Sequence, residues 1–108
     1  MNIQLKAEGL KLTDKIKDIV EEKIGADLEK YLEDFAIDMK NATVTIEKRS
    51  RWGYKVNFDM WLPGKEHIYS ESTHENLITS LTETRDQAIR QIEKYKDKTK
   101  NKEITNKF

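Results

Sequence analysis

Apolar and polar residues alternate in several stretches of this chain, which is the pattern of a β-strand with one buried face. A Pro63-Gly64 turn separates the last two of these stretches. The length of that turn leaves open whether Ile68 or Tyr69 points inward in the last strand, which is the weakest of the set. The pattern therefore predicts strands over residues 2–7, 42–47, 54–62 and 66–72.

Two longer segments instead repeat apolar residues at steps of three and four, which indicates amphipathic helices. The first is expected to begin at an N-cap, Thr13, with Asp14 adding negative charge to its first turn. Its apolar face predicts about five turns and consists of Ile16, Ile19, Val20, Ile24, Leu28, Tyr31, Leu32 and Phe35. The second is expected to begin after an N-cap at Thr73, and its apolar face consists of Leu77, Leu81, Ala88, Ile92 and Tyr95.

The predicted order of elements is β-α-β-β-β-α. Four strands with one apolar face and two amphipathic helices are expected to form an α+β fold, a two-layer sandwich with both helices on one face of a four-stranded sheet. The chain has 108 residues without an internal repeat or linker, so we expect a single domain over residues 1–98. The lysine-rich residues 99–108 are expected to be a basic, flexible tail.

Composition favours a cytoplasmic protein. The chain has no cysteine, no apolar run near the roughly 18 residues that a membrane helix needs, and no signal-peptide layout at its N-terminus. The 20 basic and 20 acidic residues cancel, but they are unevenly distributed. Residues 1–40 carry 7 basic and 10 acidic side chains, whereas residues 76–108 carry 8 basic and 5 acidic ones. A neutral total therefore does not exclude an anionic partner, because charge can gather on one surface.

Few residues are suited to catalysis or to binding a metal. His67 and His74 lack the i, i+4 spacing of two zinc ligands on one helix, and no cysteine can complete a site. The four glycines form no phosphate-binding loop, and most carboxylates fall on polar helix faces. We predict a protein that is not an enzyme and has no cofactor, bound metal or small-molecule substrate.

The second helix separates its bases from its acids. At 100° per residue from Leu77, the apolar residues fall between about 0° and 120°, and the acids near 160–200°. A sector from about 220° to 320° holds Arg90, Lys94, Lys98, Gln87 and Gln91. Such a stripe can follow a phosphate backbone. Ordinary charge patterning on a solvated helix is the alternative interpretation.

The first helix adds Lys23 and Lys30, which are seven residues apart and nearly in line, with Asp27 between them as a possible partner of either. If the two helices pack side by side, these lysines and the Arg90 stripe are expected to border one groove. Aromatic residues also offer base stacking, namely Trp52, Tyr54, Trp61 and Tyr69. Trp61 is better explained as a residue that packs across two strands.

Several short motifs, in their order and spacing, resemble bacterial ribosome hibernation promoting factors. This family includes the ribosome-associated inhibitor, also called the ribosomal subunit interface protein. The run LTDKIKDIVEEKI at residues 12–24 is similar to the opening of the family's first helix, and Glu29-Lys30-Tyr31 to its end. Glu47-Lys48 stands where the family's second strand closes. His74-Glu75-Asn76-Leu77 and Arg90-Gln91-Ile92-Glu93-Lys94 match the start and the basic middle of its last helix.

The resemblance implies a short-form, non-catalytic factor that is monomeric off the ribosome. Such proteins bind the small (30S) ribosomal subunit, contacting 16S rRNA and neighbouring ribosomal proteins. They occupy the channel for messenger and transfer RNA and hold ribosomes idle under stress, as in stationary phase. The rRNA-binding residues that we expect here are Arg90, Lys94, Lys98, Lys23, Lys30 and, more loosely, Lys48.

Two other functions fit the same residues. One is a general double-stranded-RNA-binding module, since such domains have a similar α+β shape. The other is a protein–protein adaptor that uses the open face of the sheet, where Trp61 is expected to be exposed. Competition with duplex RNA and the salt dependence of binding distinguish these three functions.

Overall fold

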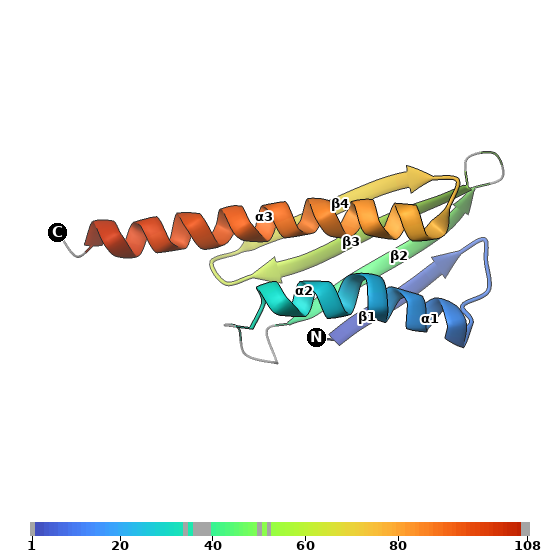
Figure 1. Cartoon of the computed structure of the whole chain (residues 1–108), viewed down its shortest axis with the longest axis horizontal. Coiled ribbons are helices and arrows are strands. Elements are labelled where there is room, and N and C mark those ends of the chain that lie inside the picture. Colours follow the sequence, from blue (N-terminus) through green and yellow to red (C-terminus); the bar gives the residue numbers. More distant parts are fainter. Residues whose placement is uncertain (1, 34, 36–39, 50, 52, 107–108) are drawn as a thin grey trace.

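The computed structural model describes residues 2–33, 35, 40–49, 51 and 53–106. The predicted β-α-β-β-β-α order is confirmed, with the first helix divided into three consecutive segments (Figure 1). The elements are β1 (Asn2–Glu8), α1 (Asp14–Val20), η1 (Glu21–Gly25), α2 (Ala26–Tyr31), β2 (Asn41–Arg49), β3 (Gly53–Leu62), β4 (Glu66–His74) and α3 (Leu77–Asn106). Trp52, one of the candidate stacking residues, lies outside the described residues.

The four strands form one mixed sheet in the order β1-β2-β3-β4. β1 and β2 are parallel, and the other two pairs are antiparallel. The predicted alternation is confirmed, because alternate residues are buried over positions 42–46 of β2 and 56–62 of β3, and the residues between them are not. In β4 the register resolves the open alternative: Ile68 points into the core, whereas Tyr69 is 42% exposed.

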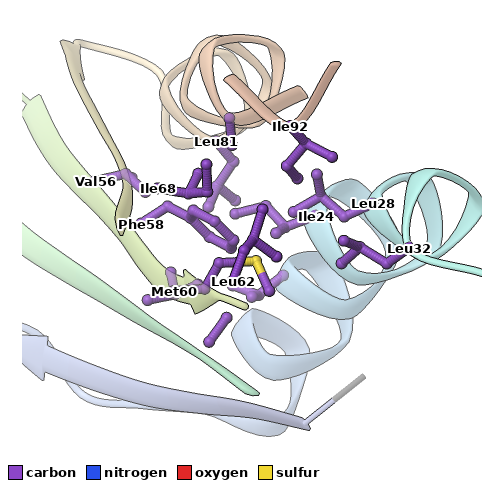
Figure 2. Close-up of a cluster of buried hydrophobic side chains, with 14 of the residues drawn as sticks. Ile24, Leu28, Leu32, Val56, Phe58, Met60, Leu62, Ile68, Leu81 and Ile92 are labelled. Atoms are coloured by element: carbon purple, nitrogen blue, oxygen red, sulfur yellow. The ribbon is translucent and has the colours of Figure 1, made fainter. Parts of the chain in front are cut away.

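The first helix (α1, η1 and α2) and α3 pack on the same face of the sheet, and the core lies between these helices and the strands. Figure 2 shows apolar side chains from η1, α2, β3, β4 and α3 meeting there. The apolar residues that are at most 1% exposed are Val20, Ile24, Leu28, Leu32, Val44, Ile46, Val56, Phe58, Met60, Leu81, Ala88 and Ile92. The expected two-layer α+β sandwich is therefore confirmed.

The first helix begins as predicted, because the Thr13 hydroxyl accepts a hydrogen bond from the Ile16 amide. It then widens into the π segment η1, which ends at Gly25. A Cβ atom on Gly25 would lie 2.8 Å from a carboxylate oxygen of Glu21 and 3.4 Å from the Ile3 side chain. A Cβ atom at this position would therefore be in ordinary contact with Ile3 of β1, and only the flexible Glu21 carboxylate would have to move. Phe35, the last residue of the predicted apolar face, lies beyond the end of α2 and still packs against the core.

The start of the last helix was wrongly predicted. Thr73 is not its N-cap, because β4 continues through His74 in register with Tyr54 of β3. Asn76 caps α3 instead, and its side-chain oxygen accepts hydrogen bonds from the amides of Ile78 and Thr79. The chain enters the helix three residues later than expected, and His74 belongs to the strand.

α3 makes the molecule long, with extents of 56 × 24 × 20 Å. Its Tyr95 hydroxyl donates to the carbonyl of Pro63 at the β3–β4 turn, and the helix then projects beyond the sheet (Figure 1). The backbone is helical through Asn106, so residues 99–106 continue α3. The flexibility that we expect of this end stays a prediction. None of the described helices is long and apolar enough to cross a membrane.

Candidate nucleic-acid interface

The three bases predicted on the last helix form a row along α3, which we call the basic row: Arg90, Lys94 and Lys98. All three side chains are exposed. Lys94 and Lys98 border a shallow hollow of about 150 Å³, which also includes Gln91 and the start of β4. Within the described part of the chain, no ion pair joins a carboxylate to any of the three. Their positive charge is therefore available to a ligand.

The two glutamines of the predicted stripe have a different role. The Gln91 side-chain amide donates to the Tyr69 carbonyl at 2.5 Å and accepts from the Tyr69 amide at 3.0 Å. The Gln87 amide donates to the carbonyl of Glu71 at 3.0 Å. These bonds satisfy backbone groups on the free edge of β4, which would otherwise be open to pairing with another strand. They also fix the rotation of α3, so that Lys94 and Lys98 lie on the β4 side.

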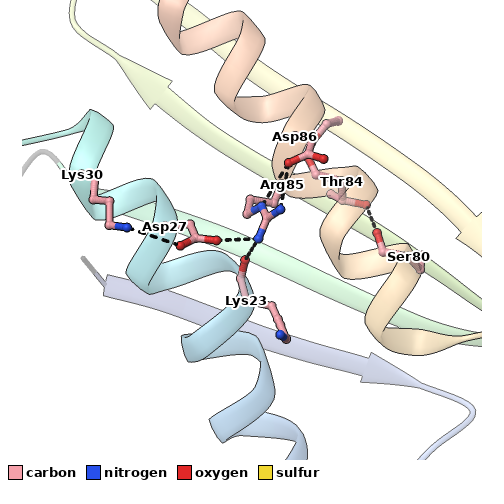
Figure 3. A network of polar contacts seen from close by, with 8 residues as sticks. Lys23, Asp27, Lys30, Ser80, Thr84, Arg85 and Asp86 are labelled. Atoms are coloured by element: carbon pink, nitrogen blue, oxygen red, sulfur yellow. Dashed lines mark hydrogen bonds and ion pairs between the residues drawn. The ribbon is translucent and has the colours of Figure 1, made fainter.

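The opposite flank of α3 carries Arg85, a residue that the sequence reasoning missed. Its guanidinium bonds Asp27 of α2 at 2.5 Å and Asp86 at 3.0 Å, and also reaches the Lys23 carbonyl at 3.5 Å (Figure 3). Its side chain is 19% exposed, so it is largely enclosed between the helices. A signal was present in the sequence: Arg85 lies at about 80° from Leu77, inside the apolar sector. A base in that sector needs a partner, because burying an unpaired charge is costly.

Lys23 and Lys30 lie on the first helix beside this Arg85 network. Lys23 is half-buried and Lys30 is exposed, with its ammonium group 4.0 Å from the Asp27 carboxylate. Lys94 follows Arg85 by nine residues, which places it about 180° away around α3. The expectation that these lysines and the basic row border one groove is therefore wrong. The two sets lie on different flanks of the same helical layer.

Lys48, the last of the expected contacts, is separated from both sets. It is exposed near the end of β2, and its ammonium group lies 4.4 Å from the centre of the Tyr54 ring. Its neighbours in the register are Tyr54 and then His74, at the far end of β4 from the hollow beside Lys98. Tyr54 packs against the core, so it does not offer a free stacking surface.

No grouping in the described residues suggests a metal centre, since no three histidine or carboxylate side chains there are placed to hold an ion. What the fold and its surface define is an α+β domain with an exposed row of bases on its last helix. This arrangement can bind phosphate groups by charge and hydrogen bonding, and needs no cofactor to do so.

A family model described as sigma 54 modulation protein / S30EA ribosomal protein matches residues 3–100. The chain therefore belongs to this family, and the resemblance inferred from its motifs is confirmed.

Solved structures agree with this membership. The chain is 26% identical to the N-terminal domain of Protein Y from Thermus thermophilus, with a TM-score of 0.71 over 88% of this chain and 99% of that one. A ribosomal subunit interface protein from Coxiella burnetii shares the fold, with 18% identity and a TM-score of 0.66 over 90% of this chain and 99% of that one. No curated protein sequence gives a significant match.

Proposed function

We propose that this protein is a non-catalytic hibernation factor that binds the small ribosomal subunit, occupies the channel for messenger and transfer RNA, and inhibits translation. The observation that carries the proposal is the family match over almost the whole chain, residues 3–100. One structure with the same fold is named a ribosomal subunit interface protein, which supports the same partner. In this proposal the protein acts as a monomer in the cytoplasm.

The basic row supplies the chemistry that such a partner requires. Structured RNA presents phosphates and 2′-hydroxyl groups, and a shape-matched protein surface binds them with little reading of bases. Arg90, Lys94 and Lys98 are exposed and point away from the core, so we assign them the principal backbone contacts. Lys23, Lys30 and Lys48 are secondary contacts on the same side of the sheet. Arg85 contributes little, because Asp27 and Asp86 neutralise its charge.

A sucrose-gradient experiment tests the proposal directly. The purified chain is mixed with 30S subunits, and in parallel with 50S subunits, and each mixture is sedimented. We expect the protein to comigrate with 30S subunits and to reduce synthesis of a reporter protein in a cell-free translation reaction. A protein that stays at the top of the gradient, or that leaves translation unchanged when it is bound, contradicts the proposal.

A pair of charge-reversal variants tests the assigned residues. Arg90→Glu with Lys94→Glu is expected to weaken 30S binding by at least about tenfold, because it places two negative charges against phosphates. The matched control is Lys6→Glu with Lys65→Glu, which changes the net charge equally but alters exposed lysines on β1 and on the β3–β4 turn. Equal binding by both double variants would remove the basic row from the interface.

The general duplex-RNA module remains the rival, since an exposed basic helix alone does not select one RNA. A long RNA duplex is therefore added as a competitor during sedimentation with 30S subunits. The ribosomal proposal requires that the duplex compete far less well than unlabelled 30S subunits. Equal competition per phosphate would favour the general module.

A further inference from the structure

The face of the sheet opposite the helices carries a cluster of aromatic side chains, and no helix or strand of the described residues covers it. Trp61 of β3 is 59% exposed and stacks on His67 of β4, with ring centres 4.3 Å apart and planes within 16°. The expected cross-strand packing of Trp61 is thereby confirmed. His67 also lies 6.1 Å from the Tyr69 ring. The Tyr69 hydroxyl donates to Glu71, and this bond raises the pKa of the phenol above its ordinary value of 10.0.

A hollow of about 320 Å³ lies beside Trp61 on this open face. The outward-facing side chains that line it come from β1, β2 and β3: Asn2, Gln4, Asn41, Thr43, Asp59 and Trp61. In the sheet, β3 has β4 on one side. On its other side lies β2, followed by β1. Because His67 covers the β4 side of the indole, the other face of Trp61 is turned toward the hollow. The volume is at the lower end of the range for ligand pockets, about 300–1000 Å³.

The charges of the hollow favour a positively charged occupant. Asp59 is the only charged residue among the described residues that line it, and none of them is basic. One carboxylate oxygen of Asp59 is 3.2 Å from the His67 ring nitrogen, and a carboxylate keeps further acceptor positions beyond one such bond. The surrounding amides and hydroxyl add acceptors for a group with several N–H donors.

We propose that this hollow binds an arginine side chain from a basic segment of a partner protein, through stacking on Trp61 and pairing with Asp59. A guanidinium is planar and stacks on aromatic faces, which suits Trp61. It also presents several N–H donors to a carboxylate, which suits Asp59. A lysine ammonium has no plane to stack and fits less well. A nucleotide would bring phosphates next to Asp59 with no lining base to neutralise them.

An NMR titration of the full chain with short peptides tests the proposal. The probe is an acetylated and amidated Gly-Arg-Gly-Ser-Arg-Gly peptide, and the reporter is the indole N–H signal of Trp61, assigned from its loss in Trp61→Phe. We expect the peptide to shift this signal and the side-chain amides of Asn2 and Gln4. A peptide with lysine in place of arginine should bind several-fold more weakly, because it keeps the positive charge but lacks the planar guanidinium that stacks on Trp61.

Variants on the open face locate the binding. Trp61→Leu and Asp59→Asn are each expected to weaken binding of the arginine peptide by about tenfold, since each removes one of the two main interactions. Both residues are at the surface, and backbone amide spectra show whether each variant is folded. Glu71→Gln is the matched control: it removes a carboxylate from the same face outside the hollow, and binding should persist.

The remaining outcomes overturn the proposal. Absence of any shift, equal binding of the lysine peptide, or unchanged binding in both Trp61→Leu and Asp59→Asn would show that no arginine site exists here. A larger shift with the tetranucleotide r(UGAU) than with the peptide would identify a base-binding face instead. The result is independent of the ribosomal proposal, because no ribosome is present. Arg90→Glu with Lys94→Glu should leave peptide binding unchanged.

Discussion

Arg85 is the residue that connects α3 to the first helix by charge. Its guanidinium contacts carboxylates from both helices and a backbone carbonyl of the π segment η1. An ion pair that is partly withdrawn from water gains more Coulomb energy than an exposed one, but it must also offset the cost of desolvation. Asp27 remains 38% exposed, which limits both effects. The pair therefore contributes moderately to stability while it fixes how the two helices lie against each other.

A double-mutant cycle measures this contribution. Arg85→Met keeps much of the side-chain length and removes the charge, and Asp27→Asn removes the opposing charge. We expect each to lower the free energy of unfolding by about 1 kcal/mol, and the coupling between them to be at least about 0.5 kcal/mol in urea denaturation. Additive effects would contradict a direct pair. Asp18→Asn, on the exposed side of α1, should have little effect.

Glu29 and Lys40 form a second pair with a pH-dependent contribution. Lys40 is only 6% exposed, and its ammonium group lies 2.5 Å from a Glu29 carboxylate oxygen. This hydrogen bond lowers the pKa of Glu29 from its ordinary 4.5. A carboxyl with a lowered pKa in the folded state binds its proton more weakly there than in the unfolded chain. Its stabilising effect is therefore complete above pH 4.5 and is lost as the pH falls through the lowered value.

We therefore predict a pH-dependent effect of Glu29→Gln. The variant should have a lower Tm than the natural chain near neutral pH, because the buried ammonium group of Lys40 loses its charged partner. The difference should shrink as the pH falls below 4.5, where the natural carboxyl also becomes neutral. Calorimetry across that range, with the exposed Glu33→Gln as control, measures it. A constant difference in Tm would contradict the assigned pair.

At the level of elements, the start of α3 gives a sharp test of the corrected cap. Asn76→Ala should lower the free energy of unfolding by about 1 kcal/mol, because two amides at the helix start lose their acceptor. Thr73→Ala should change it by less than about 0.5 kcal/mol, since Thr73 is an exposed residue of β4. The free energies come from urea unfolding followed by circular dichroism. The opposite ranking would restore Thr73 as the cap.

This cap also shows how far the sequence determines an element. Period-two alternation predicted β2 and β3 well, because one face of each strand is buried over most of its length. The helix start was harder, since Thr73 and Asn76 are both good caps and only the pairing of His74 with Tyr54 decides between them. The π segment Glu21–Gly25 was not predicted at all, since the three- and four-residue steps of the apolar face continue through it. Local patterns predict elements, and tertiary contacts set their ends.

At the scale of the whole molecule, the site was only partly predictable for the same reason. The exposed positions of Arg90, Lys94 and Lys98 follow from helical periodicity, which the structure confirms. Gln87, Gln91 and Arg85 depend on partners in β4 and α2, so their roles appear only when the layers are assembled. The groove hypothesis failed because Arg85 occupies the side of α3 that faces the first helix. The residues proposed as RNA contacts therefore lie on different flanks of the helical layer and do not border one groove.

The net charge of zero makes salt dependence an informative measure of this surface. Long-range attraction to RNA is weak for a neutral chain, so the slope of log K against log salt reports mainly the local phosphate contacts, at about 0.7 to 0.9 per contact. We predict that Lys94→Gln reduces the magnitude of this slope for 30S binding by about 0.7 to 0.9, the value of one phosphate contact. The slope is measured between about 50 and 200 mM salt at constant magnesium. Lys6→Gln, on the open face, should leave the slope unchanged. If Lys94→Gln weakens binding by the same factor at every salt concentration, Lys94 does not contact a phosphate, and the basic row must bind another group.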